Sequence, residues 1–258
     1  MIKSFGISKP GLVRTVNEDC IFCSDASFFI LADGMGGYEG GRIASTLAVK
    51  TVKDNLENLP ASAYSEDALR DAVLFANRVL LRRKFGDSDL EQMGTTLVVC
   101  AFCGNRFYWA HVGDSRLYVE QGGTLSQITH DHSLVMQLYE AGEISKEEMR
   151  HHPRKNEITR AVGIASQLSV DTGIVSLETS AKILLCSDGL STPLGDEAIR
   201  RILSETEETG EALSVSVENM VENVYKNGAT DNMSAILISY TPDENSGETD
   251  GTDERHDL

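Results

Sequence analysis

The sequence predicts an α+β fold in which two antiparallel β-sheets pack face to face and helices cover both outer faces. Three observations support this prediction. Short apolar runs joined by tight turns are typical of antiparallel strands, two amphipathic helices follow the first runs, and two more precede the last run. A helix or sheet with one apolar face must bury that face against another element, and this layered arrangement buries all of them.

The first third of the chain changes from strand periodicity to helical periodicity. Apolar, strand-like runs occupy residues 2–7, 20–24 and 28–32. A helix is predicted over 41–59 from an apolar stripe at helical spacing, which consists of Ile43, Leu47, Val52 and Leu56. Pro60 prevents this helix from continuing. A second amphipathic helix is predicted over 66–85, with Ser65 as its N-cap.

The middle of the chain predicts more antiparallel strands and then an insert. Residues 95–103 and 107–112 are rich in β-branched and apolar side chains. A hairpin is expected in which Gly122-Gly123 joins strands at 117–120 and 124–128. The insert contains two short predicted helices, at 133–141 and 145–150, the second with Ser145-x-x-Glu148 as a capping box. We call about 133–175 the flap.

The last part of the chain completes one domain. A strand is predicted at 181–187, helices at 194–204 and 211–226, and a closing strand at 233–240. The predicted domain therefore covers 1–241, a length that can bury a sizeable core. Residues 242–258 contain seven acidic residues, one basic residue and no large apolar residue except Leu258. This segment is expected to be a disordered acidic tail.

Composition excludes some classes of partner. The chain has 40 acidic and 23 basic residues and a formal charge of −17, which argues against nucleic acid or an anionic membrane surface as a general partner. No apolar stretch approaches the roughly 18–20 residues of a membrane span, and residues 1–6 do not resemble the apolar core of a signal peptide. We therefore expect a cytoplasmic protein, with a monomer as the default.

The five cysteines include two Cys-x-x-Cys pairs, at 20/23 and 100/103. The gap between the pairs is far longer than in a zinc ribbon, and residues three apart on a strand point to opposite faces. Buried thiols in a reducing compartment are the favoured interpretation. A zinc site at Cys103-Gly104 remains as the alternative.

Four aspartates lie where strand-like runs begin or end. Asp33 and Asp188 each follow an apolar run and precede glycine, Asp114 follows the run 108–113, and Asp231 precedes the run 233–238. A single aspartate at a strand end is ordinary turn chemistry, but four suggest one site assembled from several strands. Clustered carboxylates repel one another and need cations. Without a matching set of His and Cys residues, Mg²⁺ or Mn²⁺ fits best.

Two such ions could lower the pKa of a bridging water to near neutrality, and a phosphate ester is the natural electrophile because the ions also neutralise its oxygens. A site of this kind would use a guanidinium to bind phosphate with two parallel hydrogen bonds. Arg14, just before Asn17-Glu18-Asp19, is the leading candidate. The alternative is an ordinary surface arginine.

Several short motifs occur in an order that is specific when they are taken together. They are Gly11-Leu12-Val13-Arg14 with Asn17-Glu18-Asp19, Ala32-Asp33-Gly34-Met35-Gly36-Gly37, Gly94-Thr95-Thr96-Leu97, His111-Val112-Gly113-Asp114-Ser115-Arg116, Thr129-His130-Asp131-His132-Ser133, Ile158-Thr159-Arg160-Ala161-Val162-Gly163, Ser187-Asp188-Gly189-Leu190 and Asp231-Asn232-Met233-Ser234. On these residues, spread over about 3–240, the chain resembles the metal-dependent protein serine/threonine phosphatases (the PPM, or type 2C, family) of compact bacterial type.

The resemblance implies a four-layer αββα sandwich and a phosphatase that acts on phosphoserine and phosphothreonine in proteins, opposing a bacterial Ser/Thr kinase. It implies two Mn²⁺ or Mg²⁺ ions bridged by Asp33, with a third, weaker ion beside them. In the implied roles, Arg14 binds the substrate phosphate, and the Gly34 carbonyl, Asp188 and Asp231 complete the metal ligands. Asp114 with Asp188 holds the third ion. Glu18 and Asp19 act through metal-bound waters, and Asn232 supports the ligands without binding metal.

One position departs from the pattern of eukaryotic relatives. They carry a histidine, proposed to protonate the leaving oxygen, where this chain has Met35. Met35 has no proton to give, so the general acid is left open, with a water on the third ion as one option. His130, His132, His151 and His152 are candidates only if the flap folds inward, and solvated loop histidines are the simpler expectation.

Three other functions fit these residues less well. A dinucleotide-binding turn would need G-x-G-x-x-G spacing, which is absent after the strand at 28–32. A phosphoprotein-binding pseudoenzyme would be expected to have lost carboxylates that are all present. A phosphodiesterase or nuclease is disfavoured by the shortage of basic residues.

Overall fold

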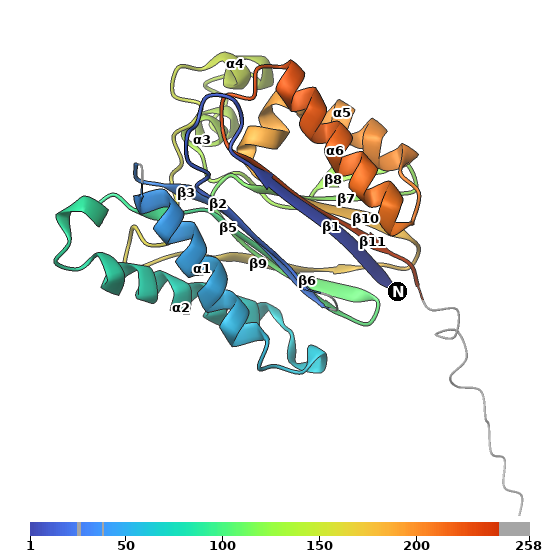
Figure 1. The fold of residues 1–258 in the computed structure, drawn as a ribbon, viewed down its shortest axis with the longest axis horizontal. Helices are drawn as coiled ribbons and strands as arrows, with labels where there is room; N and C mark the ends of the chain where they lie inside the picture. The colour runs from blue at the N-terminus through green and yellow to red at the C-terminus, as the bar shows by residue number, and fades with distance from the viewer. Residues whose placement is uncertain (25–26, 38, 243–258) are drawn as a thin grey trace, which may run out of the picture.

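Two antiparallel sheets form the centre of the molecule (Figure 1). The computed structural model describes residues 1–24, 27–37 and 39–242, so the predicted acidic tail, apart from its first residue, lies outside the described residues. The first sheet has the order β1-β11-β10-β7-β8. Its strands are β1 (Ile2–Lys9), β11 (Met233–Tyr240), β10 (Ala181–Cys186), β7 (Arg116–Gln121) and β8 (Thr124–Gln127).

The second sheet has the order β2-β3-β5-β6-β9, with a short strand β4 paired to β3. Its strands are β2 (Asp19–Cys23), β3 (Phe28–Met35), β4 (Gly94–Thr95), β5 (Leu97–Cys103), β6 (Arg106–Val112) and β9 (Asp171–Ser176). Neighbouring strands pair antiparallel throughout both sheets. Cys20 packs on the helix side of β2 and Cys23 on the side that faces the other sheet, as expected for residues three apart on a strand.

Helix pairs cover the two outer faces, on opposite sides of the sandwich in Figure 1. The helices α1 (Gly40–Leu56) and α2 (Glu66–Lys84) pack on the second sheet, and α5 (Asp188–Glu205) and α6 (Gly210–Lys226) pack on the first. Short 3₁₀ turns η1 (Ala61–Ala63) and η2 (Ser88–Leu90) flank α2. The Ser65 hydroxyl accepts a hydrogen bond from the Ala68 amide, so the predicted N-cap is confirmed.

Three apolar layers hold the four structural layers together. One lies between α1–α2 and the second sheet, one between α5–α6 and the first sheet, and one between the two sheets, where Phe29, Leu117 and Ile236 meet. Burial of apolar area is the main driving force for this packing. The predicted αββα architecture is confirmed. No helix in the described part of the chain is both long and apolar enough to span a membrane.

The flap carries two short helices, α3 (Leu134–Glu140) and α4 (Lys146–His151), which lie together beside α5 (Figure 1). The predicted capping box of α4 is present, with Ser145 and Glu148 exchanging hydrogen bonds. The structure differs from the sequence prediction at β9, because residues 171–175 belong to an edge strand paired with β6. It differs again at α5, which begins at Asp188 and not at Leu194, with a non-helical Gly195 inside it.

Candidate active site

A cavity of about 600 Å³ lies where β3 and β10 approach their C-terminal ends. It brings together residues that the sequence analysis selected from positions more than two hundred residues apart. Eight of the nine predicted site residues line it: Arg14, Glu18, Asp33, Gly34, Asp114, Asp188, Asp231 and Asn232. The ninth, Asp19, lies beside Asp33 on the neighbouring strand, as its pairing partner in the β2–β3 ladder.

Two hydrogen bonds between its backbone and Thr96 hold Asp33 in place. Its amide donates to Thr96 Oγ1 at 2.9 Å, and its carbonyl accepts from the Thr96 amide at 2.8 Å. Asp33 lies within β3, two residues before the strand ends at Met35, and not past the strand end as predicted. A carboxylate on a paired strand has less freedom than one on a loop, which suits a ligand that must keep its geometry.

Asp188 and Asp231 come from neighbouring strands of the other sheet. Asp188 follows β10 and starts α5, whereas Asp231 precedes β11, and these strands run antiparallel, so both carboxylates lie at the same edge. The chain packs closely here, since a Cβ on Gly189 would lie 1.9 Å from the carbonyl oxygen of Asn232. Only glycine permits this contact between the start of α5 and the turn that carries Asp231.

Asp114 lies in the turn between β6 and β7. The preceding residue, Gly113, has a φ of +112°, a conformation that glycine adopts without strain. The next residue, Ser115, is fully buried and its hydroxyl lies 2.8 Å from Thr96 Oγ1. Thr96 therefore connects the turn that carries Asp114 to the backbone of Asp33.

Arg14 reaches the cavity from the loop between β1 and β2. The amide of Leu12 donates to the carbonyl of Ala229 at 2.8 Å, which places this loop beside the turn before β11. The Asn232 side chain fastens the same loop: its Oδ1 accepts from the Glu18 amide at 2.9 Å, and its Nδ2 donates to the carbonyls of Pro10 and Val16 at 3.1 and 3.0 Å.

The cavity is strongly anionic. Burial, followed by repulsion from Asp19, Asp188 and Asp114, raises the pKa of Asp33 well above its usual range. Burial also raises the pKa of Asp114 and Asp188. Burial raises the pKa of Asp19 to about 7, although hydrogen bonds from Ser234 and Ser187 oppose the shift. Arg14 is the one basic side chain among the described residues that line this cavity.

The donor set fits hard divalent cations. It consists of carboxylate and carbonyl oxygens, the ligands that Mg²⁺ and Mn²⁺ prefer. Two buried carboxylate oxygens, Glu18 Oε1 and Asp19 Oδ1, have no hydrogen-bond partner among the described residues. Unpaired buried carboxylates are costly, and cations or their water ligands would remove that cost.

Comparison with known proteins adds independent evidence. The family model described as protein phosphatase 2C matches residues 14–237. The chain belongs to the protein phosphatase 2C family. Membership confirms the resemblance found in the sequence, and it makes the protein a serine/threonine protein phosphatase, a hydrolase of phosphoproteins.

Relatives in this family include bacterial phosphatases of similar length. Serine/threonine phosphatase stp of Listeria welshimeri is 38% identical, and the match covers 88% of this chain and 92% of that protein. Protein phosphatase PhpP of Streptococcus pneumoniae is 34% identical, with 92% and 97% covered. The crystal structure of the Mycobacterium tuberculosis serine/threonine phosphatase PstP superposes with a TM-score of 0.86 at 32% identity, covering 93% of this chain and 99% of that one. A further structure of the PstP catalytic domain, with a TM-score of 0.83 at 32% identity and 92% and 97% coverage, is described as a complex with two manganese ions.

The 2C-family sequence motifs include site neighbours to which the sequence analysis gave no role. Thr96 and Ser115 are buried and link Asp33 to the turn that carries Asp114. Val13, Met35 and Ile158 form apolar parts of the cavity wall. The signal in the sequence was the polar pair Thr95-Thr96 at the start of an otherwise apolar strand, because a buried hydroxyl needs a hydrogen-bond partner.

The expectation for His132 is wrong. It is 3% exposed, not a solvated loop residue. Its amide donates to the Gly113 carbonyl at 2.7 Å, its Nδ1 accepts from the Gly113 amide at 3.0 Å, and its Nε2 lies 3.1 Å from Asp171 Oδ2. By contrast, His130 and His151 are exposed and lie beside Glu140 and Glu147. A buried contact with β9 could not be foreseen while 171–175 was assigned to the flap.

His111, His132 and Asp171 form a second group with metal-ligand chemistry, their ligand atoms lying within 4.8 Å of one another. The hydrogen bonds argue against a metal there. Because His132 Nδ1 accepts from a backbone amide, its proton is on Nε2, which then donates to Asp171. A metal on Nε2 would require an imidazolate. The hydrogen bonds of His132 therefore link Gly113, which precedes Asp114, to Asp171 of β9.

Proposed function

We propose that this phosphatase hydrolyses phosphoserine and phosphothreonine esters by using divalent cations held between its two sheets. The observation that carries the proposal is the convergence of Asp33 from one sheet with Asp188 and Asp231 from the other in a single anionic cavity that also receives Arg14. Surface-exposed carboxylates could remain apart in water, but buried ones need a compensating charge.

The proposed metal ligands are those that line the cavity. Asp33 would bridge two ions, the Gly34 carbonyl would complete one coordination sphere, and Asp188 and Asp231 would hold the first ion. Asp114, with Asp188, would hold a third, weaker ion. Bound divalent cations supply the charge that activates water and neutralises phosphate oxygens. Manganese and magnesium share this oxygen-ligand chemistry, so either could serve.

The protein's own groups would orient the ligands and the substrate. Asn232 fastens the loop that carries Glu18, and Ser187 donates to Asp19 Oδ2 at 2.9 Å. These contacts limit the motion of carboxylates that would act through water. Arg14 is half exposed, so its guanidinium can turn from Asp231 toward a phosphate with little cost in buried contacts. Met35 supplies no proton, so the general acid must be another group.

The predictions about the protein's partners, cellular location and oligomeric state rest on the sequence. An opposing Ser/Thr kinase, a cytoplasmic location, a monomeric state and the absence of nucleic-acid or membrane partners remain predictions. The domain boundary at 241 and the flap limits near 133–175 are also proposals, with 171–176 better grouped with the second sheet because β9 pairs with β6.

The decisive experiment measures hydrolysis of p-nitrophenyl phosphate and of a phosphothreonine peptide with Mn²⁺, with Mg²⁺ and with excess EDTA. We expect activity on both substrates, loss in EDTA, and recovery when Mn²⁺ is restored. Asp33→Asn, which keeps the side-chain size, should be inactive with either metal. A folded, metal-loaded protein without activity would support the alternative of a phosphoprotein-binding pseudoenzyme.

A further inference from the structure

A second cavity, of about 240 Å³, lies between the flap helices and the first turns of α5. It is lined from both sides, by α3 and α4 of the flap and by residues 188–196 of α5. It shares Asp114, Asn156 and Asp188 with the cavity that contains the proposed metal ligands, so the two cavities adjoin. We call it the flap pocket. Apart from these shared residues, nothing in the reaction proposed above uses it.

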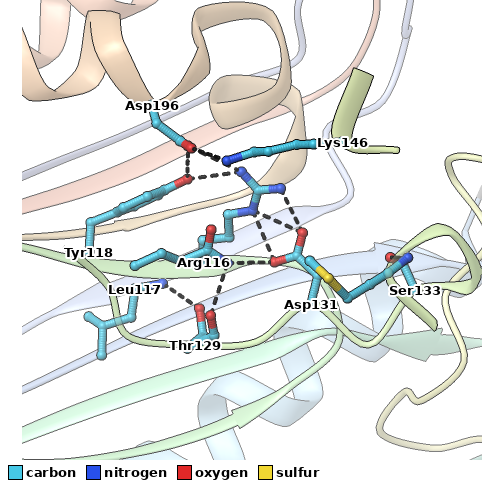
Figure 2. A network of polar contacts seen from close by, with 10 residues as sticks. Arg116, Leu117, Tyr118, Thr129, Asp131, Ser133, Lys146 and Asp196 are labelled. Carbon is cyan, nitrogen blue, oxygen red and sulfur yellow. Dashed lines mark hydrogen bonds and ion pairs between the residues drawn. The ribbon is translucent and has the colours of Figure 1, made fainter. Parts of the chain in front are cut away.

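One wall of the flap pocket is a fixed polar network (Figure 2). Arg116 Nε lies 3.0 Å from both carboxylate oxygens of Asp131, and its Nη2 lies 2.6 Å from Oδ2. Arg116 Nη1 donates to the Tyr118 hydroxyl, which donates to Asp196 Oδ1 at 3.0 Å. Lys146 of α4 reaches across to Asp196, at 3.7 Å. The carboxylates of this wall are therefore already paired with cations or hydrogen-bond donors.

The remaining lining combines apolar and basic side chains. Val135, Met136 and Met149 give an apolar surface, and methionine adapts to differently shaped side chains. Arg150 and Lys155 also line the pocket. Arg150 has one exposed ion pair, with Glu147 at 3.6 Å, and Lys155 forms no ion pair with any described residue.

The segment that carries Arg150 and Lys155 has a net positive charge, whereas the whole chain is negative. The segment 146–155 has four basic and two acidic residues, in a protein with a formal charge of −17. Four acidic and four basic side chains line the pocket, and Arg154 of this segment pairs with Glu157. The local attraction for acidic groups therefore comes from Arg150 and Lys155. The pocket is also smaller than the roughly 300–1,000 Å³ of a typical small-molecule site, which favours a few side chains of a polypeptide.

We propose that the flap pocket binds the segment of the substrate protein next to the phosphorylated residue, and that it selects an apolar side chain flanked by an acidic one. The inference rests on the proposed phosphatase function, since it places the phosphoryl group in the adjoining cavity. The apolar side chain enters between α3 and α4, and the acidic side chain pairs with Arg150 and Lys155.

The test compares two phosphothreonine peptides that differ only in the flanking residues, Leu and Glu in one and Ser and Lys in the other. Because p-nitrophenyl phosphate has no flanking chain, we divide kcat/KM for each peptide by kcat/KM for p-nitrophenyl phosphate. This ratio isolates the contribution of the flap pocket. We expect the wild-type enzyme to prefer the Leu/Glu peptide about tenfold at low salt, in keeping with a few exposed charge pairs. High salt should reduce this preference.

The variant with Arg150→Glu and Lys155→Glu should lose that preference, mainly through a higher KM for the Leu/Glu peptide. The matched control is Arg82→Glu with Arg83→Glu on the exposed face of α2, which makes the same change in net charge far from the pocket. Met149→Ala should also lower the preference for the Leu/Glu peptide, through a weaker contact with its Leu side chain.

Equal use of both peptides by the wild-type enzyme would overturn the proposal, and so would an equal effect of the test and control variants. These results differ from failure of the proposed function, in which p-nitrophenyl phosphate itself is not hydrolysed. An equal change in kcat/KM for both peptides and p-nitrophenyl phosphate in the Arg150/Lys155 variant would also overturn it, because the flap would then act on the catalytic cavity and not on the peptide.

Discussion

Arg14 Nη2 lies 2.8 Å from Asp231 Oδ2, so the residue proposed to bind phosphate is paired with a residue proposed to bind metal. The pair is exposed on both sides, with 50% and 36% of the side chains accessible, and exposed ion pairs contribute little stability. A cation on Asp231 would compete with the guanidinium for the same oxygen. Metal binding and release of Arg14 toward the substrate would therefore be coupled.

This coupling makes a prediction for Arg14→Ala. Loss of charged hydrogen bonds to a phosphate costs about 1.5–3 kcal/mol, so kcat/KM should fall about 10- to 100-fold. Most of the loss should appear in KM if Arg14 binds ground state and transition state equally. Steady-state kinetics with a phosphothreonine peptide measure this. Arg14→Lys is the control that keeps the charge but loses the planar fork, and unchanged kinetics in Arg14→Ala would place Arg14 outside the site.

The aspartate cluster predicts opposite effects on stability with and without metal. Asp33→Asn removes a charge that burial and neighbouring carboxylates oppose, so its melting temperature in EDTA should be at or above that of the wild type. Mn²⁺ at about 100 times its Kd should stabilise the wild type by about 2.7 kcal/mol, but not this variant.

Thermal melts in EDTA and Mn²⁺, with turnover measured on the same samples, test this prediction. Asp33→Ala, Asp188→Ala and Asp231→Ala should each abolish turnover and leave the fold intact. Asp71→Asn, on the exposed surface of α2, is the matched control and should behave like wild type. Near wild-type activity in any of the three Ala variants would remove that residue from the metal site.

The hydrogen bonds of His132 predict different effects for two amide substitutions. In His132→Asn the amide oxygen can still accept from the Gly113 amide, whereas in His132→Gln the amide lies where Nε2 was and only the contact with Asp171 can remain. Groups behind metal ligands typically change metal affinity 10- to 100-fold. His132→Gln should therefore need about tenfold more Mn²⁺ for half-maximal activity, and His132→Asn less.

Activity titrated with Mn²⁺, together with thermal melts, distinguishes this positioning role from a structural one. If both variants lose stability equally and keep the wild-type Mn²⁺ dependence, His132 does not position the Asp114 turn.

His111 predicts sensitivity to acid. Burial, followed by repulsion from His132, lowers its pKa to about 3, and neither ring nitrogen has a hydrogen-bond partner among the described residues. Between pH 6.5 and 3 the unfolded chain binds a proton that the folded chain does not, so stability is full above pH 6.5 and falls as the pH is lowered. The slope reaches about 1.4 kcal/mol per pH unit.

His111→Phe removes this contribution, so its unfolding free energy should decline less between pH 6.5 and 4 than that of the wild type. Urea unfolding at several pH values measures the difference. His151→Asn, at the exposed end of α4, is the control. Parallel pH profiles for wild type and His111→Phe would show that other groups dominate.

Sequence reasoning was most successful where one local signal determined the structure. The apolar stripes of α1 and α2 and the caps at Ser65 and Ser145 depend on nearby residues. The same reasoning failed for β9, an edge strand in which Ile174 is 43% exposed, so its pattern lacks the apolar run of a buried strand. It failed for the start of α5 because Pro193 and Gly195 interrupt helical periodicity.

The candidate site was also predicted only where the signal was local. Each aspartate could be selected because it lies at the start or end of an apolar run, and three of the four also adjoin a glycine. The burial of His132 and the role of Thr96 depend on partners far away in the chain, such as Asp171 and Ser115. Such long-range contacts produce no periodic pattern in the sequence.

The proposed ligands are divided between the two sheets, with Asp33 on one and Asp188 and Asp231 on the other. The distance between these groups is therefore fixed by the thickness of the apolar layer where Phe29, Leu117 and Ile236 meet. A substitution that thins or swells this layer would change the spacing of the ligands without touching any of them. Loss of activity in such a variant would be a geometric defect, and cations of different radius should restore it to different degrees.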